Sequence, residues 1–553
     1  MARSLPSDGD VDLAVVVAAS LVLIAILSAR FSQRFGMPAL VLFVSVGMFA
    51  GSSGPLGIEF EDYGLSLNIG LLALAIIIFS GGLDTRYRLF RAAVLPAGLL
   101  ATVGVLLTAG ILALLAWWLT PLDLVTSLLL GAVLGSTDAA ATFAALKGRG
   151  LPTRLKAVLE TESGTNDPVA IYLTMALVSM AGAGALGAFG LVAGVVLQLG
   201  LGAAYGWAAG KALVFVINRV ALDGAGLYPV LALAGALLAY GLANIAYGNG
   251  FVTIYVVGLV LGNAHLAHRR SIASFMDGAA WGAQVLMFVL LGLLAFPERL
   301  SASLPSAIVI TLALALVARP TAVAATLGVL RLATRGRYAF TLPEITLVSW
   351  AGLKGAVPII LAIVPLLAAV PGAESVFDVV FVVVILGTAL QGATIAPLAR
   401  RLGLERVEPP RPPVTLELGG AAPVGAAVFD VYLESARRAV GCRLGDLEIP
   451  DDVVVAGILR AGKLVTPRGS TVFLAGDHVY LISGDADTVG IPPAFSGRRR
   501  PEPVAEPVAA PGSEPVVAPV VAPVVAPPEP EAPPASEAEP AAEAQPAADT
   551  KCT

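Results

Sequence analysis

Charged residues are scarce in this chain, and that scarcity excludes an ordinary soluble protein. Only 13% of the 553 residues are Asp, Glu, Lys or Arg, whereas 57% are hydrophobic. The mean hydropathy is +0.85. Soluble globular domains carry about a quarter of charged residues. The composition therefore predicts a polytopic membrane protein, much of whose surface contacts membrane lipid.

Cysteine is almost absent, which excludes two further classes. Cys442 and Cys552 lie far apart in the sequence, and such spacing suggests neither a disulfide framework nor a Cys-based metal site. Catalytic metal motifs such as H-E-x-x-H are also missing. We therefore expect a protein that is not an enzyme, with no cofactor and no nucleic-acid partner.

Apolar segments of about 20 residues, long enough to cross a bilayer, recur along the first 400 residues. The first one follows Asp8 and Asp10 rather than a basic leader, so we interpret it as a retained helix and not as a signal peptide. Thirteen such segments are predicted, at approximately residues 12–29, 39–56, 65–83, 92–119, 122–146, 152–180, 186–217, 226–247, 251–263, 276–296, 303–330, 340–369 and 375–399.

The connecting loops indicate the orientation of the chain. Lys and Arg gather in every second loop, while the alternate loops, such as GSSGPLGIEFEDYG, are nearly free of them. The positive-inside rule then places the N-terminus outside and the C-terminus in the cytoplasm of a cell (inner) membrane protein. The expected fold is an all-α membrane domain of about thirteen helices over residues 1–406.

The composition changes after this domain. Residues 407–413 form a Pro-rich linker. Residues 414–488 contain short alternating segments, VVVAGILR, STVFLAG and HVYLISG, which predict strands of a small cytoplasmic α+β domain. From residue 489 a Pro/Ala/Glu/Val repeat lacks the pattern needed to bury a core, so residues 489–553 are expected to be a disordered tail.

The sixth segment carries acids where a lipid-facing helix would not. A charge in mid-bilayer costs roughly 2.5–3.5 kcal/mol on insertion scales, so such acids are expected to face the bundle interior or a water cavity. At 100° per residue, Glu160, Ser163 and Asp167 share one face, and Glu162 and Asn166 share its neighbour. Asp167 lies roughly 22 Å along the helix from its start, near mid-membrane.

Pro168 follows Asp167 and lacks the N–H that would bond the carbonyl of Gly164. A free carbonyl beside Ser163 and Asp167 would provide oxygens of several kinds around one carboxylate, which suits a hard cation. Glu160 is placed nearer the cytoplasmic end, where it could line the approach to that site.

Two further segments show signs of interruption. The fifth contains GAVLGSTDAAATF, with Asp138 after Gly-Ser-Thr, and the twelfth contains SWAGLKGAVPII around Lys354. A helix N-cap and close helix packing are the alternative interpretations. Because the two segments are seven apart, they fit two inverted repeats of six helices, with broken helices that aim their dipole ends at an ion.

ESGTNDPVAIYLT, with GSTDAAA upstream and GLKGAVPI downstream, resembles the NhaP-type monovalent cation:proton antiporters over residues 10–400. LGDLEIPDDVVVAGILRAGKLVTPRGSTVFLAGDHVYLI is similar to the C-terminal subdomain of the RCK/TrkA regulatory module. The combination resembles the potassium/proton antiporter branch. It implies a homodimer that exchanges one K⁺ for one H⁺ by alternating access, and a small ligand for residues 414–488.

The resemblance also assigns roles to individual residues. It places the ion-binding, proton-carrying aspartate at Asp167 and its partner asparagine at Asn166. The coordinating serine falls on Ser163, and the Thr-Asp pair of the fifth segment on Thr137 and Asp138. The monovalent cation is then expected at Asp167, Ser163 and Thr137.

The resemblance implies a structural ion pair between Glu162 and the basic residue of the twelfth segment, and it marks Arg319 as an intramembrane base. That basic residue is Lys354, where the family usually has Arg. Many relatives also carry a Glu near the end of the third segment, where this chain has Gly81 and Gly82. The missing acid weakens any transfer of ion selectivity, which leaves Na⁺(Li⁺)/H⁺ exchange as an alternative.

Two other classes are weighed against the antiporter. A potassium channel subunit would need a filter loop of the TVGYG type, which is absent. An intramembrane enzyme or a signalling receptor finds no His within any predicted span to support metal chemistry.

Overall fold

The computed structural model describes residues 8–35, 39–52, 54–146, 149–183, 188–407, 427–435, 437–483 and 495. The chain divides into two compact units. The first consists of Met1–Glu408 with Gly419–Pro423, and the second of Pro409–Leu418 with Val424–Thr553. Of the predicted linker and tail, only Val407 and Phe495 lie among the described residues.

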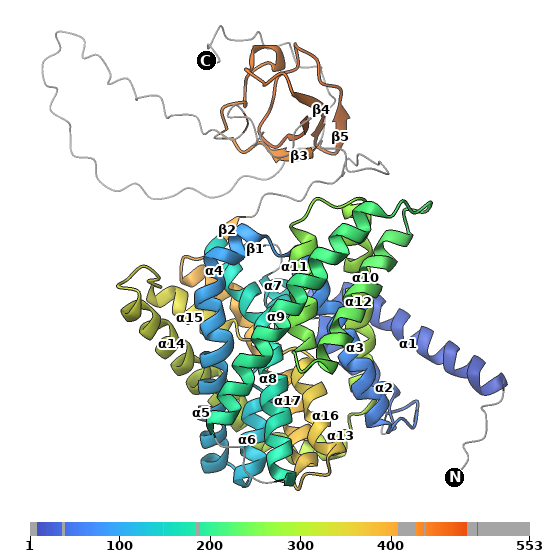
Figure 1. The fold of residues 1–553 in the computed structure, drawn as a ribbon, viewed down its shortest axis with the longest axis vertical. Coiled ribbons are helices and arrows are strands. Elements are labelled where there is room, and N and C mark those ends of the chain that lie inside the picture. The colour runs from blue at the N-terminus through green and yellow to red at the C-terminus, as the bar shows by residue number, and fades with distance from the viewer. Residues whose placement is uncertain are drawn as a thin grey trace, which may run out of the picture. The chain divides into compact units, whose positions relative to one another are not determined.

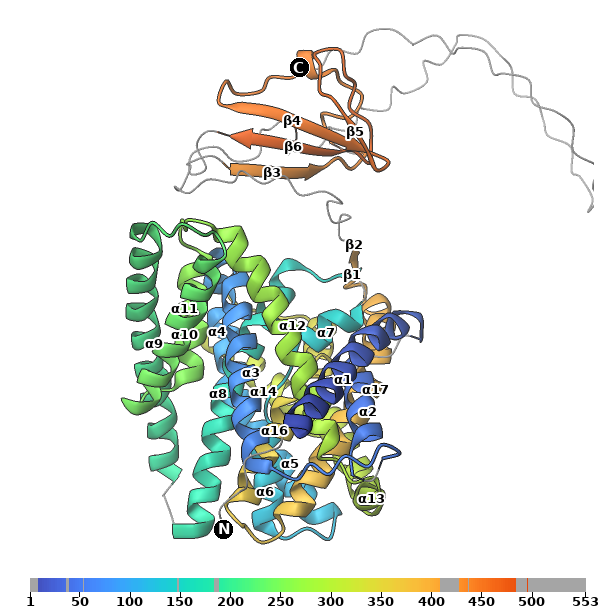
Figure 2. The same ribbon diagram turned by 90° about the vertical axis from the view of Figure 1, so that its right-hand side faces the viewer.

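The first unit consists of helices joined by loops, with one short strand pair, as Figures 1 and 2 show. Its elements are α1 (Asp8–Phe35), α2 (Ala39–Ala50), α3 (Tyr63–Asp84), α4 (Tyr87–Leu99), the π-helix η1 (Leu100–Gly104), α5 (Val105–Leu119), α6 (Leu124–Val133), α7 (Ala139–Leu146), α8 (Thr153–Ala183), α9 (Ala188–Arg219), α10 (Leu227–Ile245), α11 (Gly250–Gly262), α12 (Arg269–Leu293), α13 (Pro297–Ala313), the π-helix η2 (Leu314–Ala318), α14 (Arg319–Ala333), α15 (Leu342–Trp350), α16 (Val357–Leu367) and α17 (Ala373–Arg401).

Each of the thirteen predicted segments contains one helix or two successive helices. Among the described residues, seven helices are long and apolar enough to cross a membrane, and five shorter apolar helices accompany them. The predicted number of crossings stays a prediction. Trp118, Ile245 and Leu332 are each at least 77% exposed. Apolar side chains exposed on this scale indicate a lipid-facing surface.

The core of the first unit lies around α16 and α8. Every residue of α16 from Val357 to Pro365 is buried, and α16 packs against α3, α6, α8 and α17. A helix that is apolar all round is suited only to such an enclosed position. This enclosure leaves the polar face of α8 directed at neighbouring helices instead of at lipid.

The predicted interruptions of two segments are confirmed. The fifth segment is divided between α6, which ends at Val133, and α7, which begins at Ala139. The twelfth is divided between α15, which ends at Trp350, and α16, which begins at Val357. The π-helices η1 and η2 interrupt the fourth and eleventh segments and were not predicted.

A short antiparallel ladder joins two loops of the first unit. Strand β1 (Arg149–Gly150) precedes α8, and strand β2 (Arg406–Val407) follows α17. Arg149 pairs with Val407, and Gly150 pairs with Arg406. The connection between α7 and α8 is therefore hydrogen-bonded to the chain that leaves the helical unit.

The second unit is an antiparallel sheet of β3 (Ala427–Tyr432), β4 (Val453–Arg460), β5 (Lys463–Val465) and β6 (His478–Ser483), in the order β3-β6-β4-β5. Its described residues add one 3₁₀-helix, Leu444–Asp446. VVVAGILR forms β4, and β6 covers most of HVYLISG, as predicted. Phe473 is fully buried and packs edge-on against Phe495.

The prediction of a sheet strand over STVFLAG is wrong, because the segment pairs with residues 441–444 and not with the sheet. The Phe473 N–H donates to the Cys442 carbonyl, the Phe473 carbonyl accepts from the Gly441 N–H, and the Thr471 carbonyl accepts from the Leu444 N–H. Side chains take further backbone groups, since the Val472 carbonyl accepts from Arg460 Nη2 and the Leu474 N–H donates to Asp477 Oδ2. An isolated bridge joins Val472 and Arg443. The same Asp477 carboxylate accepts two hydrogen bonds of 2.8 Å from Arg460 and so raises the pKa of that guanidinium.

Candidate ion-binding site

The two unwound stretches between α6 and α7 and between α15 and α16 meet in the interior of the helical unit. The Asp138 N–H donates to the Leu353 carbonyl at 2.8 Å. In return, Lys354 Nζ donates to the Ser136 carbonyl at 2.7 Å. Backbone groups that leave a helix inside a membrane must find partners in the protein. Here each stretch supplies partners for the other.

We call the contact between the unwound stretches 134–138 and 351–356 the crossing. Three hydroxyl groups complete it. Thr142 Oγ1 of α7 donates to the Ala351 carbonyl at 2.8 Å, and Thr388 Oγ1 of α17 donates to the Lys354 carbonyl at 2.8 Å. The Ala139 N–H, at the start of α7, donates to Ser163 Oγ of α8 at 3.0 Å. The crossing is thus fastened to α8 at Ser163.

The face of α8 that carries Asn166 is also joined to the crossing. Asn166 is fully buried, and its Nδ2 donates to Thr137 Oγ1 at 2.6 Å. The structure thus brings Thr137, Ser163 and Asn166 to the same crossing. Asn166 Oδ1 has no hydrogen-bond partner within the described residues.

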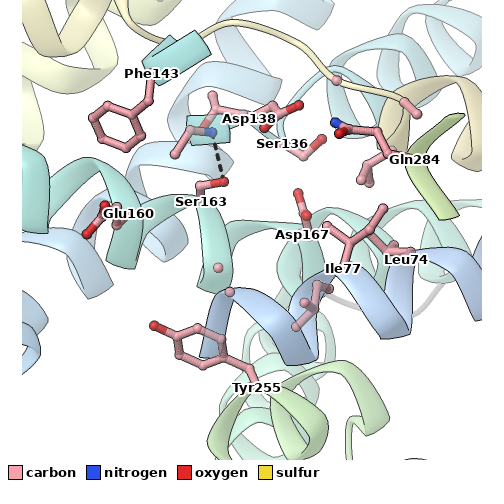
Figure 3. Close-up of a pocket in the computed structure, with 18 of the residues that line it drawn as sticks. Leu74, Ile77, Ser136, Asp138, Phe143, Glu160, Ser163, Asp167, Tyr255 and Gln284 are labelled. Carbon is pink, nitrogen blue, oxygen red and sulfur yellow. Dashed lines mark hydrogen bonds between the residues drawn. The ribbon is translucent and has the colours of Figure 1, made fainter. Parts of the chain in front are cut away.

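A cavity of about 290 Å³ opens beside this junction. Five of the predicted site residues line it: Thr137, Asp138, Glu160, Ser163 and Asp167. Figure 3 shows Asp167 with its carboxylate directed into the space bounded by Ser163, Ser136 and Asp138. Hydroxyl and carboxylate groups of α8 and of the unwound stretch before α7 thus line one space, a donor set that suits a hard cation.

The charges at the cavity are unequal. Asp138 and Asp167 are close enough to repel each other, and Lys354 is the positive charge acting on Asp167. Lys354 is 2% exposed and held to the Ser136 carbonyl. Two carboxylates opposite one ammonium group attract a further positive charge, either a cation or a proton.

The predicted ion pair of Glu162 with Lys354 is wrong. Glu162 Oε1 instead pairs with Nη2 of Arg319 at 2.5 Å, and both side chains are at least 98% buried. Arg319 begins α14, directly after the π-helix η2, and lies against Gly352 of the unwound stretch. The long guanidinium reaches Glu162 from there, while the Lys354 ammonium is used by the crossing. Asn166 likewise faces Thr137 and not Lys354.

Pro168 is buried within α8, which is continuous from Thr153 to Ala183. The cavity also has residues that sequence reasoning missed. Tyr255 of α11, Gln284 of α12 and Asp84 at the end of α3 all line it. Asp84 lies two residues after Gly82 and is the last residue of α3. Tyr255 lies in a short apolar segment in which no charge draws attention to it.

The helical unit matches the family model described as "Sodium/hydrogen exchanger, transmembrane" over residues 19–401. The chain belongs to this exchanger family. Family membership makes it a multi-pass membrane protein and a cation/proton antiporter. The sheet unit matches the TrkA-C domain over residues 428–488. The two expected similarities are thereby confirmed.

Curated relatives resemble this exchanger over both units. It is 38% identical to the K(+)/H(+) antiporter NhaP2 of Shewanella oneidensis over 487 residues, 87% of this chain and 83% of the relative. It is 36% identical to the K(+)/H(+) antiporter NhaP of Alkalimonas amylolytica over 484 residues, with the same coverage. The fold resembles that of the sodium proton antiporter MjNhaP1 from Methanocaldococcus jannaschii, with a TM-score of 0.61, 22% identity and coverage of 71% of this chain and 99% of that one.

Proposed function

We propose that the cation exchanged for protons is potassium and that cation and proton bind alternately at Asp167. The observation that carries the site is the convergence of Asp167, Ser163 and Thr137 on one cavity beside two broken helices. Potassium is supported by the names of the relatives that are 36–38% identical over most of the chain.

The charge balance supports exchange of one ion for one proton. A single positive charge neutralises the excess of two carboxylates over Lys354, whether it arrives as K⁺ or as H⁺. Since both species satisfy the same carboxylate, binding of one displaces the other. Exchange is then electroneutral, with Asp167 as the shared site and Asn166 as a neutral group that positions Thr137.

The remaining parts of the proposal concern placement and regulation. We place the chain in the cell (inner) membrane with its N-terminus outside and residues 414–488 in the cytoplasm, because Lys and Arg occupy the loops on that side. We further propose a homodimer, and a small ligand that regulates exchange through the TrkA-C domain. The chain acts as a transporter and not as an enzyme.

The test is cation-induced proton release from everted membrane vesicles, followed with a pH-sensitive dye across pH and with K⁺, Na⁺, Li⁺ and Rb⁺ in turn. Asp167→Asn is expected to abolish release while the protein still inserts. Asp223→Asn removes a carboxylate from an exposed loop and is the control, with unchanged release expected. Proton release by the Asp167→Asn protein would refute the assignment of Asp167.

Sodium is the second candidate, because the matching family model is described as a sodium/hydrogen exchanger. Exchange with Na⁺ or Li⁺ but not with K⁺ would replace potassium as the cargo and leave Asp167 in its role. Flux of K⁺ that is not coupled to a proton gradient would instead support the channel alternative.

A further inference from the structure

Tyr255 carries a buried polar group that the exchange at Asp167 does not use. The side chain, in the middle of α11, is 3% exposed. Its hydroxyl interacts with the Thr85 side chain but makes no hydrogen bond of normal geometry within the described residues. Buried tyrosine hydroxyls usually find a partner. Because this residue lines the cavity, its hydroxyl is available to a ligand there.

The ring of Tyr255 lies over Gly164 of α8. A Cβ atom added to Gly164 would come within 2.7 Å of the ring's Cε2 and 3.2 Å of its Cζ. Glu160, Gly164 and Asp167 follow one face of α8, at positions i, i+4 and i+7. The ring therefore covers the strip of helix that separates the two carboxylates.

The Tyr255 hydroxyl lies nearer to Glu160 than to Asp167 along this face of α8. In Figure 3 it points away from Asp167, on the side of the view where Glu160 lies. The Glu160 carboxylate is close enough to interact with it electrostatically. Asp84 and Thr85, at the end of α3, line the same cavity. Glu160, Asp84 and Thr85 thus bring oxygens to the cavity together with the Tyr255 hydroxyl.

The cavity wall beyond these groups is largely apolar. Its side chains include Leu74, Ile77, Ile78, Phe143, Met287 and Phe288. A cation that sheds water among apolar side chains loses solvation, unless oxygen ligands replace that water. Oxygens at Tyr255 and Glu160 would supply this replacement before the cation reaches Asp167.

We propose a second monovalent-cation site, formed by the Tyr255 hydroxyl with Glu160, Asp84 and Thr85. We call it the outer site and the site at Asp167 the inner site, and neither word refers to a side of the membrane. The cation resides there on its way to or from Asp167. The inference rests on the proposed function for the identity of the cargo, but its occupancy does not require Asp167 to be ionised.

This independence provides the test. Purified full-length Asp167→Asn protein, which lacks the carboxylate of the inner site, is heated with increasing KCl, and with choline chloride as the control for ionic strength. A cation bound only to the folded state raises the melting temperature in a saturable way. Saturable stabilisation by K⁺ but not by choline is expected.

The hydroxyl is then removed without the ring. In Asp167→Asn/Tyr255→Phe, the half-saturating K⁺ concentration is expected to rise roughly tenfold, the change that loss of one hydrogen bond or ligand produces. Asp167→Asn/Tyr240→Phe is the matched control. Tyr240 packs against Phe251 and is not among the residues that line the cavity, so no change is expected.

Absence of K⁺-specific stabilisation in Asp167→Asn would overturn the outer site, as would equal half-saturation with and without the Tyr255 hydroxyl. Failure of the proposed function has a different signature, namely proton release by Asp167→Asn vesicles. The outer site can therefore be refuted while the role of Asp167 stands, and the role of Asp167 can be refuted while the outer site stands.

Discussion

Arg319 and Lys354, two buried basic side chains of the helical unit, bind different partners. Arginine presents a planar fork of donors, whereas lysine presents a compact point charge. Arg319 fits the carboxylate of Glu162, and Lys354 fits a single carbonyl in the crossing. The two basic residues are therefore not interchangeable, and Lys354 takes no part in the Glu162 pair.

A double-mutant cycle tests this division. Breaking a buried pair by removing one partner costs about 3–5 kcal/mol, because the other charge stays buried. Glu162→Gln and Arg319→Met should each destabilise strongly, and the double variant should lose much less than their sum. Thermal unfolding of the purified protein measures the three values.

The control cycle combines Glu162→Gln with Lys354→Met. Because no hydrogen bond joins these residues and only their charges interact, coupling should be smaller than in the Arg319 cycle. Coupling in the Lys354 cycle that exceeds coupling in the Arg319 cycle would restore the pair predicted from the sequence.

Sequence reasoning at the residue scale was limited to what lies on one helix. The cost of charge in lipid singled out Asp167, and helical spacing placed Ser163 and Glu160 on its face. The partner of Glu162 could not be derived in this way, because two bases from different segments were available and only the packed helices decide between them. Tyr255 could not be singled out from the sequence, because a tyrosine in an apolar run has the same pattern as an ordinary aromatic core residue.

At the scale of elements, the crossing of the two broken segments organises the site. Gly-Ser-Thr-Asp and Gly-rich runs predicted both breaks, since these residues favour caps and turns over helix interiors. The π-helices η1 and η2 left no such signal, because one extra residue per turn does not alter an apolar run. They interrupt segments that are seven apart, as the breaks do, which agrees with the predicted inverted repeats.

The hydrogen bond from Thr142 to the Ala351 carbonyl provides a test of the crossing. Thr142→Val keeps the shape of the side chain but leaves a buried carbonyl without its donor, at an expected cost of about 1–3 kcal/mol. The melting temperature should fall, and the rate of cation-induced proton release should fall with it.

Thr346→Val is the control, since its hydroxyl donates to the Leu342 carbonyl of its own helix at an exposed position. Equal melting temperatures for the Thr142 and Thr346 variants would mean that the crossing does not depend on this bond.

At the scale of the whole molecule, hydropathy alone separates the apolar helical unit from the sheet unit. The change of composition after residue 406 lies close to the end of the main segment of the first unit, at Glu408. The β1–β2 ladder could not be predicted, because two residues of strand carry no pattern. The predicted tail lies outside the described residues apart from Phe495, which packs in the core of the sheet unit.

Truncation tests whether the helical unit acts alone. A protein that ends at Glu408 keeps β2 and is expected to retain cation-induced proton release in vesicles. A protein that ends at Arg401 loses β2 and leaves the backbone of Gly150 unpaired, at roughly 1 kcal/mol for each hydrogen bond lost. Its melting temperature should be the lower of the two, and identical melting curves would contradict a stabilising role for the ladder.

The ladder also has a mechanical consequence. It clasps the chain just before α8 to the chain just after α17, so that every helix from α8 to α17 lies within one loop closed by backbone hydrogen bonds. A load applied to the polypeptide beyond residue 407 is therefore shared between α17 and the connection that joins α7 to α8. Part of any pull on the C-terminal part of the chain thus reaches the segment that leads into the helix carrying Asp167.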